Sequence, residues 1–103
     1  MTAEISRVLV VDDDPNLTDL LVDTLSAIGY EPHSAGSAQE ALKVLSSMRI
    51  DLVISDINMP EMSGIELLQE IKKRNRRLPV MLITGIGSDG IKAQAYSKGA
   101  DGF

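Results

Sequence analysis

Short apolar runs alternate along the chain with stretches of helical periodicity, a pattern typical of α/β proteins. The runs at 8–11, 52–54 and 80–83 have the length and composition of strands that are buried on both faces. A further, more polar strand is expected at 30–35, where Pro32 restricts it to a sheet edge because proline cannot donate a backbone hydrogen bond. Four strands are therefore expected, with the second in chain order at an edge.

Helices are expected between and after these strands. Two of them begin with the sequence of a capping box, Ser37 with Glu40 and Ser63 with Glu66. Gly29 is expected to end the first helix. The apolar residues at helical spacing are Leu17, Leu20, Leu21, Leu25 and Ile28 in the first helix, Ala38, Ala41, Leu42, Leu45 and Met48 in the second, and Ile65, Leu68 and Ile71 in the third. A last helix is expected from roughly 88 to 98.

This alternation, without repeats or linkers, predicts a single α/β domain with a doubly wound parallel sheet. Because the second strand lies at an edge, the chain must step outward from the first strand and return across it to place the third. The predicted spatial order is 2-1-3-4. In such sheets ligands bind beyond the carboxyl ends of the two strands between which the chain reverses direction, here the first and the third.

Carboxylates gather at this expected switch point. Asp12 and Asp13 follow the first strand, and Asp56 ends the third. Clustered carboxylates repel one another, which raises their pKa values unless a cation joins them. The chain has no cysteine and one histidine, so a metal would be held by oxygen ligands, which favours Mg²⁺. Asp14, directly before Pro15, is instead expected to cap the first helix.

Composition narrows the classes of function. A net charge of −5 argues against a nucleic-acid-binding surface, and no apolar stretch is long enough to span a bilayer or to act as a signal sequence. We therefore expect a cytoplasmic protein. The basic residues at 72–74 and 76–77 are interpreted as a solvated helix end, where cations suit the helix dipole.

Five segments together resemble the receiver domain of response regulators, the chemotaxis-regulator-like proteins of two-component signalling. They are residues 11–15 (VDDDP), residues 55–60 (SDINMP), Gly64, residues 83–85 (ITG) and residues 99–103 (GADGF). The resemblance covers essentially the whole chain, so residues 1–103 are expected to form one receiver domain. It implies a flavodoxin-like strand order of 2-1-3-4-5.

The resemblance also implies a chemistry for the carboxylates. Asp56 would accept a phosphoryl group from the phosphohistidine of a histidine kinase or phosphotransfer protein. Asp13, helped by Asp12, would hold Mg²⁺ together with Asp56 and the backbone carbonyl of Asn58. The protein would then be a regulatory phosphoacceptor rather than an enzyme, with only slow self-phosphorylation and self-dephosphorylation.

A switch and its partners follow from the same resemblance. Thr84 would contact the phosphoryl group through its hydroxyl, and Phe103 matches the aromatic residue that moves inward with that threonine. The modified surface would control an output domain or protein. Pairing of two receivers through the fourth-helix face is left open, and neither a membrane nor nucleic acid is an expected direct partner.

Two other functions are compatible with parts of the pattern. Asp12 and Asp14 form an Asp-x-Asp pattern, as in Mg²⁺-dependent phosphohydrolases with an aspartyl-phosphate intermediate, but that interpretation leaves Asp56 unexplained. A degenerate receiver that binds partners without phosphorylation is the second alternative. Residues 85–90 fit the G-x-G-x-x-G pattern of dinucleotide sites but follow the fourth strand rather than the first, so they are interpreted as loop flexibility.

The chain departs from the family pattern at its end. It stops at Phe103, before most of the fifth strand, the fifth helix and the lysine that pairs with the phosphoryl group in receivers. Lys98 lies before Gly99 and does not match that lysine. A receiver truncated at its C-terminus is therefore expected, with apolar sheet surface left bare over the third and fourth strands on the face of the first helix.

Overall fold

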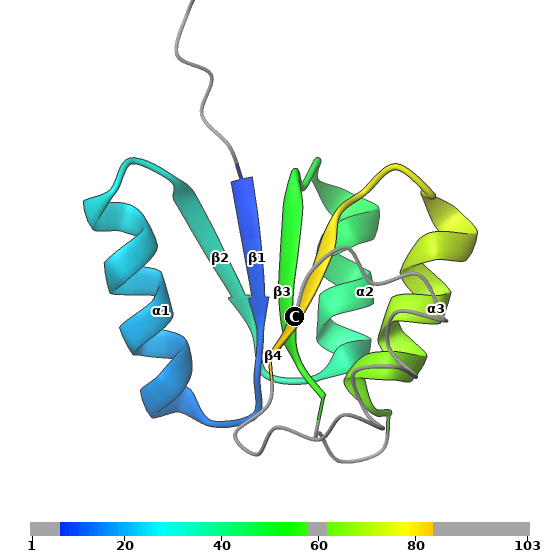
Figure 1. Cartoon of the computed structure of the whole chain (residues 1–103), viewed down its shortest axis with the longest axis horizontal. Coiled ribbons are helices and arrows are strands. Elements are labelled where there is room, and N and C mark those ends of the chain that lie inside the picture. The colour runs from blue at the N-terminus through cyan, green and yellow to red at the C-terminus, as the bar shows by residue number, and fades with distance from the viewer. Residues whose placement is uncertain (1–6, 58–61, 84–103) are drawn as a thin grey trace, which may run out of the picture.

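In the part of the chain that the structure describes, a parallel sheet of four strands carries one helix on one face and two on the other (Figure 1). The computed structural model describes residues 7–57 and 62–83. The sheet order is β2-β1-β3-β4, as predicted. In chain order the elements are β1 (Arg7–Val11), α1 (Pro15–Ala27), β2 (Glu31–Ala35), α2 (Ala38–Ser47), β3 (Leu52–Asp56), α3 (Gly64–Arg74) and β4 (Val80–Ile83). The helix predicted near 88–98 lies outside the described residues.

The register of the central strands places their carboxyl ends level with each other. Val11 pairs with Ser55 of β3 on one side and with Ala35 of β2 on the other. The residues that follow, Asp12 and Asp56, therefore leave the sheet at the same edge. This edge is the switch point, because the chain turns toward β2 after β1 and toward β4 after β3.

The main hydrophobic core lies between the sheet and the pair α2 and α3. Alternate residues of β1, β3 and β4 point to this side, and Leu9, Val53 and Leu82 among them are fully buried. From α3, Leu67 and Leu68 fill the opposite side of the core. Leu67 was not among the residues predicted to face inward, although it is fully buried.

Helix α1 is buried less completely than the strand β1 that it covers, where Val8 and Val10 are fully buried. Leu20 is 60% exposed and Ile28 is 65% exposed, so the apolar repeat of α1 does not form a uniformly buried face. Thr18 is the buried residue of this helix. Met81, on the same side of β4, is 38% exposed. Gly29 follows the end of α1 with a φ of 102°, a conformation that favours glycine, as predicted.

The two predicted capping boxes differ in the structure. In α3 the box is complete: the Glu66 amide donates to Ser63 Oγ at 3.2 Å, and the Ser63 amide donates to Glu66 Oε1 at 3.1 Å. In α2 the Glu40 amide donates to Ser37 Oγ, but the Glu40 carboxylate accepts from the Gly36 amide at 2.6 Å. The α2 prediction was therefore correct for the cap and wrong for the partner of Glu40.

Candidate metal centre at the switch point

Three carboxylates meet beyond the carboxyl ends of β1 and β3. Oxygen atoms of Asp12, Asp13 and Asp56 lie within 4.8 Å of one another. Asp12 is buried, Asp56 is half-buried and Asp13 is exposed. The cluster predicted from the sequence is confirmed as a geometric fact, and it is open to solvent on the side of Asp13.

Asp12 is the most constrained member of the cluster. Asp12 is only 2% exposed, and its backbone amide donates to the Ala35 carbonyl at 3.1 Å. One carboxylate oxygen, Oδ1, accepts from the Asp14 amide at 2.8 Å. The other, Oδ2, is buried and has no hydrogen-bond partner among the described residues. The turn formed through Oδ1 was not predicted, so Asp12 shapes the loop as well as contributing charge.

The surroundings of Asp12 disfavour its ionised form. Burial raises the pKa of its carboxyl group, the hydrogen bond from Asp14 lowers it, and the nearby charges of Asp56, Asp13 and Asp14 raise it again, for a net increase. A divalent cation would relieve both the repulsion and the unsatisfied oxygen. An all-oxygen set with one open side also matches the preferences of Mg²⁺, so the residues present fit this metal.

Close backbone packing fixes the end of β3. The Ile57 amide donates to the Ile83 carbonyl at 3.0 Å, and the Gly64 amide donates to the Ile57 carbonyl at 2.9 Å. A Cβ atom on Gly64 would overlap the carbonyl oxygen of Asp56 and lie 2.9 Å from its carbonyl carbon. Glycine at 64 therefore lets α3 begin directly against the backbone that carries Asp56.

The start of α1 separates Asp14 from the cluster. Asp14 is the N-cap, as predicted, and its Oδ1 accepts from the Asn16 amide at 2.9 Å. Thr18 then donates its hydroxyl to the Asp14 carbonyl at 3.0 Å. Thr18 was not predicted as a site residue, because its only signal in the sequence is a hydroxyl four residues after the cap in an otherwise apolar repeat. Because the clustered carboxylates do not include Asp14, the geometry disfavours the Asp-x-Asp phosphohydrolase interpretation.

Three predicted site residues cannot be placed relative to this cluster. Asn58, Thr84 and Phe103 lie outside the described residues, as do the glycines of 85–90 and Lys98. Their roles remain predictions from the sequence.

Comparison with known proteins gives one consistent result. The family model of the response regulator receiver domain matches residues 8–103. The chain is 40% identical over 103 residues to the transcriptional regulatory protein GlrR of Escherichia coli, spanning all of this chain and 23% of GlrR. It is also 40% identical over 94 residues to the sensor histidine kinase RcsC of E. coli, covering 91% of this chain and 10% of RcsC. The chain thus spans a quarter or less of these relatives.

A solved structure extends the likeness to three dimensions. The response regulator TrrA from Thermotoga maritima, determined in complex with Mg²⁺ and BeF, superimposes with a TM-score of 0.86 at 40% identity. The match covers 95% of this chain and 84% of TrrA.

Proposed function

Because the chain belongs to the response regulator receiver domain family, we propose that it is a Mg²⁺-dependent phosphoacceptor that is modified on Asp56. The phosphoryl group would come from a histidine kinase or a phosphotransfer protein, and the domain would extend over residues 1–103. The observation that supports this proposal best is the cluster of Asp12, Asp13 and Asp56 at the switch point of a receiver fold.

Asp56 is the proposed nucleophile. One of its carboxylate oxygens attacks the phosphorus, and the bond from phosphorus to the donor breaks with its electron pair leaving on the donor. The product is an acyl phosphate, and no general base is needed because the carboxylate attacks in its ionised form. The contact of Gly64 with the Asp56 backbone supports this role, since it fixes the strand end from which the side chain reaches the phosphoryl group.

Asp12 and Asp13 are proposed to hold the metal with Asp56 and the backbone carbonyl of Asn58. When bound, Mg²⁺ neutralises charge on the phosphoryl oxygens during transfer. The buried Oδ2 of Asp12 supports this assignment because it has no hydrogen-bond partner among the described residues. In TrrA, the solved complex with Mg²⁺ and BeF gives a precedent within the family.

The response to phosphorylation is proposed from the sequence pattern. Thr84 would contact the phosphoryl group and Phe103 would move with it, which changes the surface that an output domain or protein recognises. Turnover would be limited to slow self-phosphorylation and self-dephosphorylation. A degenerate receiver that binds without phosphorylation is the alternative.

The partners of this domain are also part of the proposal. GlrR is a transcriptional regulatory protein and RcsC a sensor histidine kinase, so similar domains occur in proteins of different roles.

Within the described residues, no helix has the length and apolar character needed to cross a membrane. We propose that the domain acts in the cytoplasm. Sedimentation with and without phosphorylation would test whether two copies of the domain pair.

Intact mass spectrometry after incubation with acetyl phosphate and Mg²⁺ tests this function. The wild-type chain is expected to gain one phosphoryl group, and Asp56→Asn is expected to gain none. Asp23→Asn, which changes an exposed aspartate of α1, is the matched control and should behave as wild type. Omitting Mg²⁺ should abolish the adduct. A folded wild-type chain that forms no adduct would favour the degenerate receiver instead.

A further inference from the structure

A pocket of about 300 Å³ lies between the C-terminal ends of α2 and α3, at the opposite end of the strands from the carboxylate cluster. Its floor is apolar and buried, with Ile50, Ile71 and Leu78 among its lining residues. Arg49 and Arg74 line it as well. Together, these residues form an apolar depression with cations at its border.

A second hollow of about 300 Å³ continues from this pocket toward the start of β4. It shares Arg49, Ile50 and Leu78 with the pocket and adds Arg77 and Pro79. We call the two hollows, with the cations beside them at 72–77, the basic groove. Because the two hollows adjoin through these shared residues, the groove offers room for more than one residue of an extended segment.

The charge of this region is opposite to that of the chain as a whole. Five of the ten lysines and arginines lie between Lys72 and Arg77, on a chain with a net charge of −5. The helix dipole accounts for residues 72–74 in the last turn of α3, but Arg76 and Arg77 lie beyond the C-cap, Asn75. Arg49 joins them from the connection between α2 and β3. The interpretation of the cluster as a helix end is therefore incomplete.

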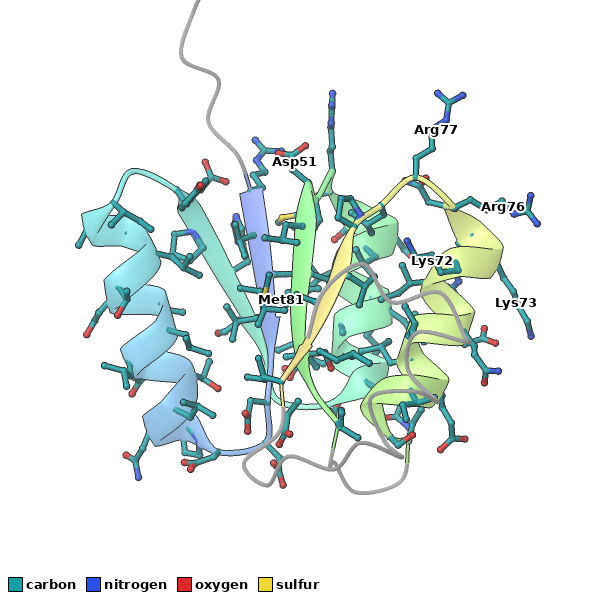
Figure 2. The ribbon with its side chains drawn as sticks, in the orientation of Figure 1. Asp51, Lys72, Lys73, Arg76, Arg77 and Met81 are labelled. Atoms are coloured by element: carbon teal, nitrogen blue, oxygen red, sulfur yellow. The ribbon has the colours of Figure 1, made fainter. Side chains whose placement is uncertain are left out.

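Three of these cations are not used by the described fold. Within 7–57 and 62–83, no hydrogen bond or ion pair involves the guanidinium groups of Arg74, Arg76 or Arg77. Figure 2 shows the side chains of Arg76 and Arg77 projecting away from the body of the domain. By contrast, Lys73 pairs with Glu70 at 3.2 Å.

Asp51, a carboxylate that lines the second hollow, is already engaged. It pairs with Arg49 Nε at 3.3 Å through Oδ1 and accepts from the Arg7 amide at 2.8 Å through Oδ2. The negative charge of Asp51 offsets that of Arg49, whereas Arg74, Arg76 and Arg77 have no carboxylate partner among the described residues.

The loop that presents these arginines is held in place by the fold. The Lys72 ammonium donates to the Leu78 carbonyl at 2.8 Å and to the Arg76 carbonyl at 3.4 Å. The Arg77 amide donates to Asn75 Oδ1 at 3.0 Å. A surface whose backbone is ordered before binding loses less conformational entropy when a partner docks.

We propose that the basic groove binds an acidic segment of a partner protein that inserts one apolar side chain into the pocket. Charge complementarity with Arg74, Arg76 and Arg77 favours acidic residues in the segment, and the apolar floor at Ile71 and Leu78 favours a leucine, methionine or phenylalanine between them. The groove is remote from the carboxylate cluster, so this inference does not depend on phosphorylation of Asp56.

Other anionic partners fit the surface less well. A membrane would need exposed apolar side chains near the cations, but the large exposed apolar residues in the described part of the chain are Leu20, Ile28, Tyr30 and Met81. None of these lines the groove. Duplex nucleic acid has no projecting apolar side chain that would enter the pocket, so only its phosphates would use this surface.

A panel of short fluorescent peptides tests the proposal on the whole chain. Each peptide carries one leucine, methionine or phenylalanine among glutamates, and a matched peptide replaces the apolar residue with serine. We expect amide shifts in two-dimensional NMR to concentrate at 45–50 and 71–79 for the best binder. Loss of the buried side chain should weaken binding roughly tenfold or more.

Matched variants separate the groove from general charge effects. Reversing two cations in Arg74→Glu/Arg77→Glu should weaken binding about tenfold at low salt. Lys43→Glu reverses an exposed lysine of α2 that does not line the groove and should leave the affinity within about twofold. Ser46→Trp places a bulky side chain at an exposed lining position and should block the pocket while the circular dichroism spectrum stays unchanged.

Several outcomes would overturn the proposal. One is that no peptide of the panel binds with a dissociation constant below about 1 mM. Equal binding of the serine peptides, or stronger binding of phosphatidylserine vesicles or of a DNA duplex through the same residues, would show a general anion surface instead. Self-association in sedimentation that Arg74→Glu/Arg77→Glu abolishes would identify a second copy of the chain as the occupant.

Discussion

Asp12→Asn is expected to stabilise the fold in the absence of Mg²⁺ and to remove most of the stabilisation that Mg²⁺ provides. Asp12 is 2% exposed, and its Oδ2 has no hydrogen-bond partner among the described residues. A buried, unsatisfied polar group costs about 1–3 kcal/mol. Asparagine removes the buried charge and its repulsion with Asp13 and Asp56, and it keeps an Oδ1 atom for the Asp14 amide. We therefore expect a gain of about 1 kcal/mol in the free energy of unfolding.

The pH dependence follows from the raised pKa of Asp12. Burial favours the protonated form in the folded state, so the folded protein binds this proton more tightly than the unfolded chain does. The contribution of Asp12 to stability is therefore fully present below the pKa that it has in the unfolded chain. It is lost as the pH rises through the higher pKa of the folded state. The advantage of Asp12→Asn should be largest at neutral and alkaline pH and should disappear at acid pH, where both chains are neutral at this position.

Mg²⁺ should reverse the order of the two proteins. At free Mg²⁺ ten times its dissociation constant, binding to the folded state alone contributes about 1.4 kcal/mol. Wild type should gain this amount, whereas Asp12→Asn should gain much less because it has lost an ionised ligand. With Mg²⁺ the wild-type chain should then equal or exceed the variant in stability.

Urea denaturation followed by circular dichroism, with Mg²⁺ or with a chelator, measures all of these quantities. Asp23→Asn is the control because this exposed aspartate of α1 is not in the cluster, and its stability should stay within about 0.5 kcal/mol of wild type. An Asp12→Asn variant less stable than wild type without metal, or equal stabilisation of both chains by Mg²⁺, would contradict the role given to the buried charge of Asp12.

Three further substitutions test how the fold positions the carboxylates. Gly64→Ala should destabilise the fold by about 2 kcal/mol and slow phosphorylation, because the added Cβ overlaps the Asp56 carbonyl. Gly36→Ala is the control, since its Cβ would make only an ordinary side-chain contact. Urea denaturation measures the stability of both variants, and intact mass measures their phosphorylation. Thr18→Val should cost about 1 kcal/mol through the lost hydrogen bond to the Asp14 carbonyl, and Thr18→Ser should recover part of that stability in the same denaturation assay. Ser63→Ala should cost about 1 kcal/mol and increase amide hydrogen exchange in the first turn of α3, and unchanged exchange there would contradict the importance of this cap.

The sheet and the carboxylate cluster could be predicted because each depends on features that are local in sequence. Apolar runs identify the strands, and Pro32 identifies the edge strand, which together give the order around β1. Once that order is known, Asp12 and Asp56 must emerge at the same edge, because parallel strands have their carboxyl ends on one side. The cap of α1 at Asp14 was predictable for a similar reason, since Pro15 limits where the helix can begin.

Other features depend on packing that the sequence pattern does not specify. Helical periodicity shows which residues of α1 share a face, but the depth of burial depends on what covers them, and Leu20 and Ile28 are exposed. The choice of Glu40 between the Ser37 and Gly36 amides depends on its side-chain rotamer. Thr18 can be recognised as a residue of the site only from its hydrogen bond to the Asp14 carbonyl, which the sequence pattern does not specify.

Chemical trapping of the phosphorylated residue identifies the phosphoacceptor. After incubation with acetyl phosphate and Mg²⁺, borohydride reduces an acyl phosphate to an alcohol, which converts a phosphorylated aspartate to homoserine and releases phosphate. Peptide mapping by mass spectrometry is expected to find homoserine at position 56 and at no other aspartate. Homoserine at position 12 or 13, with Asp56 unchanged, would contradict the proposed role of Asp56.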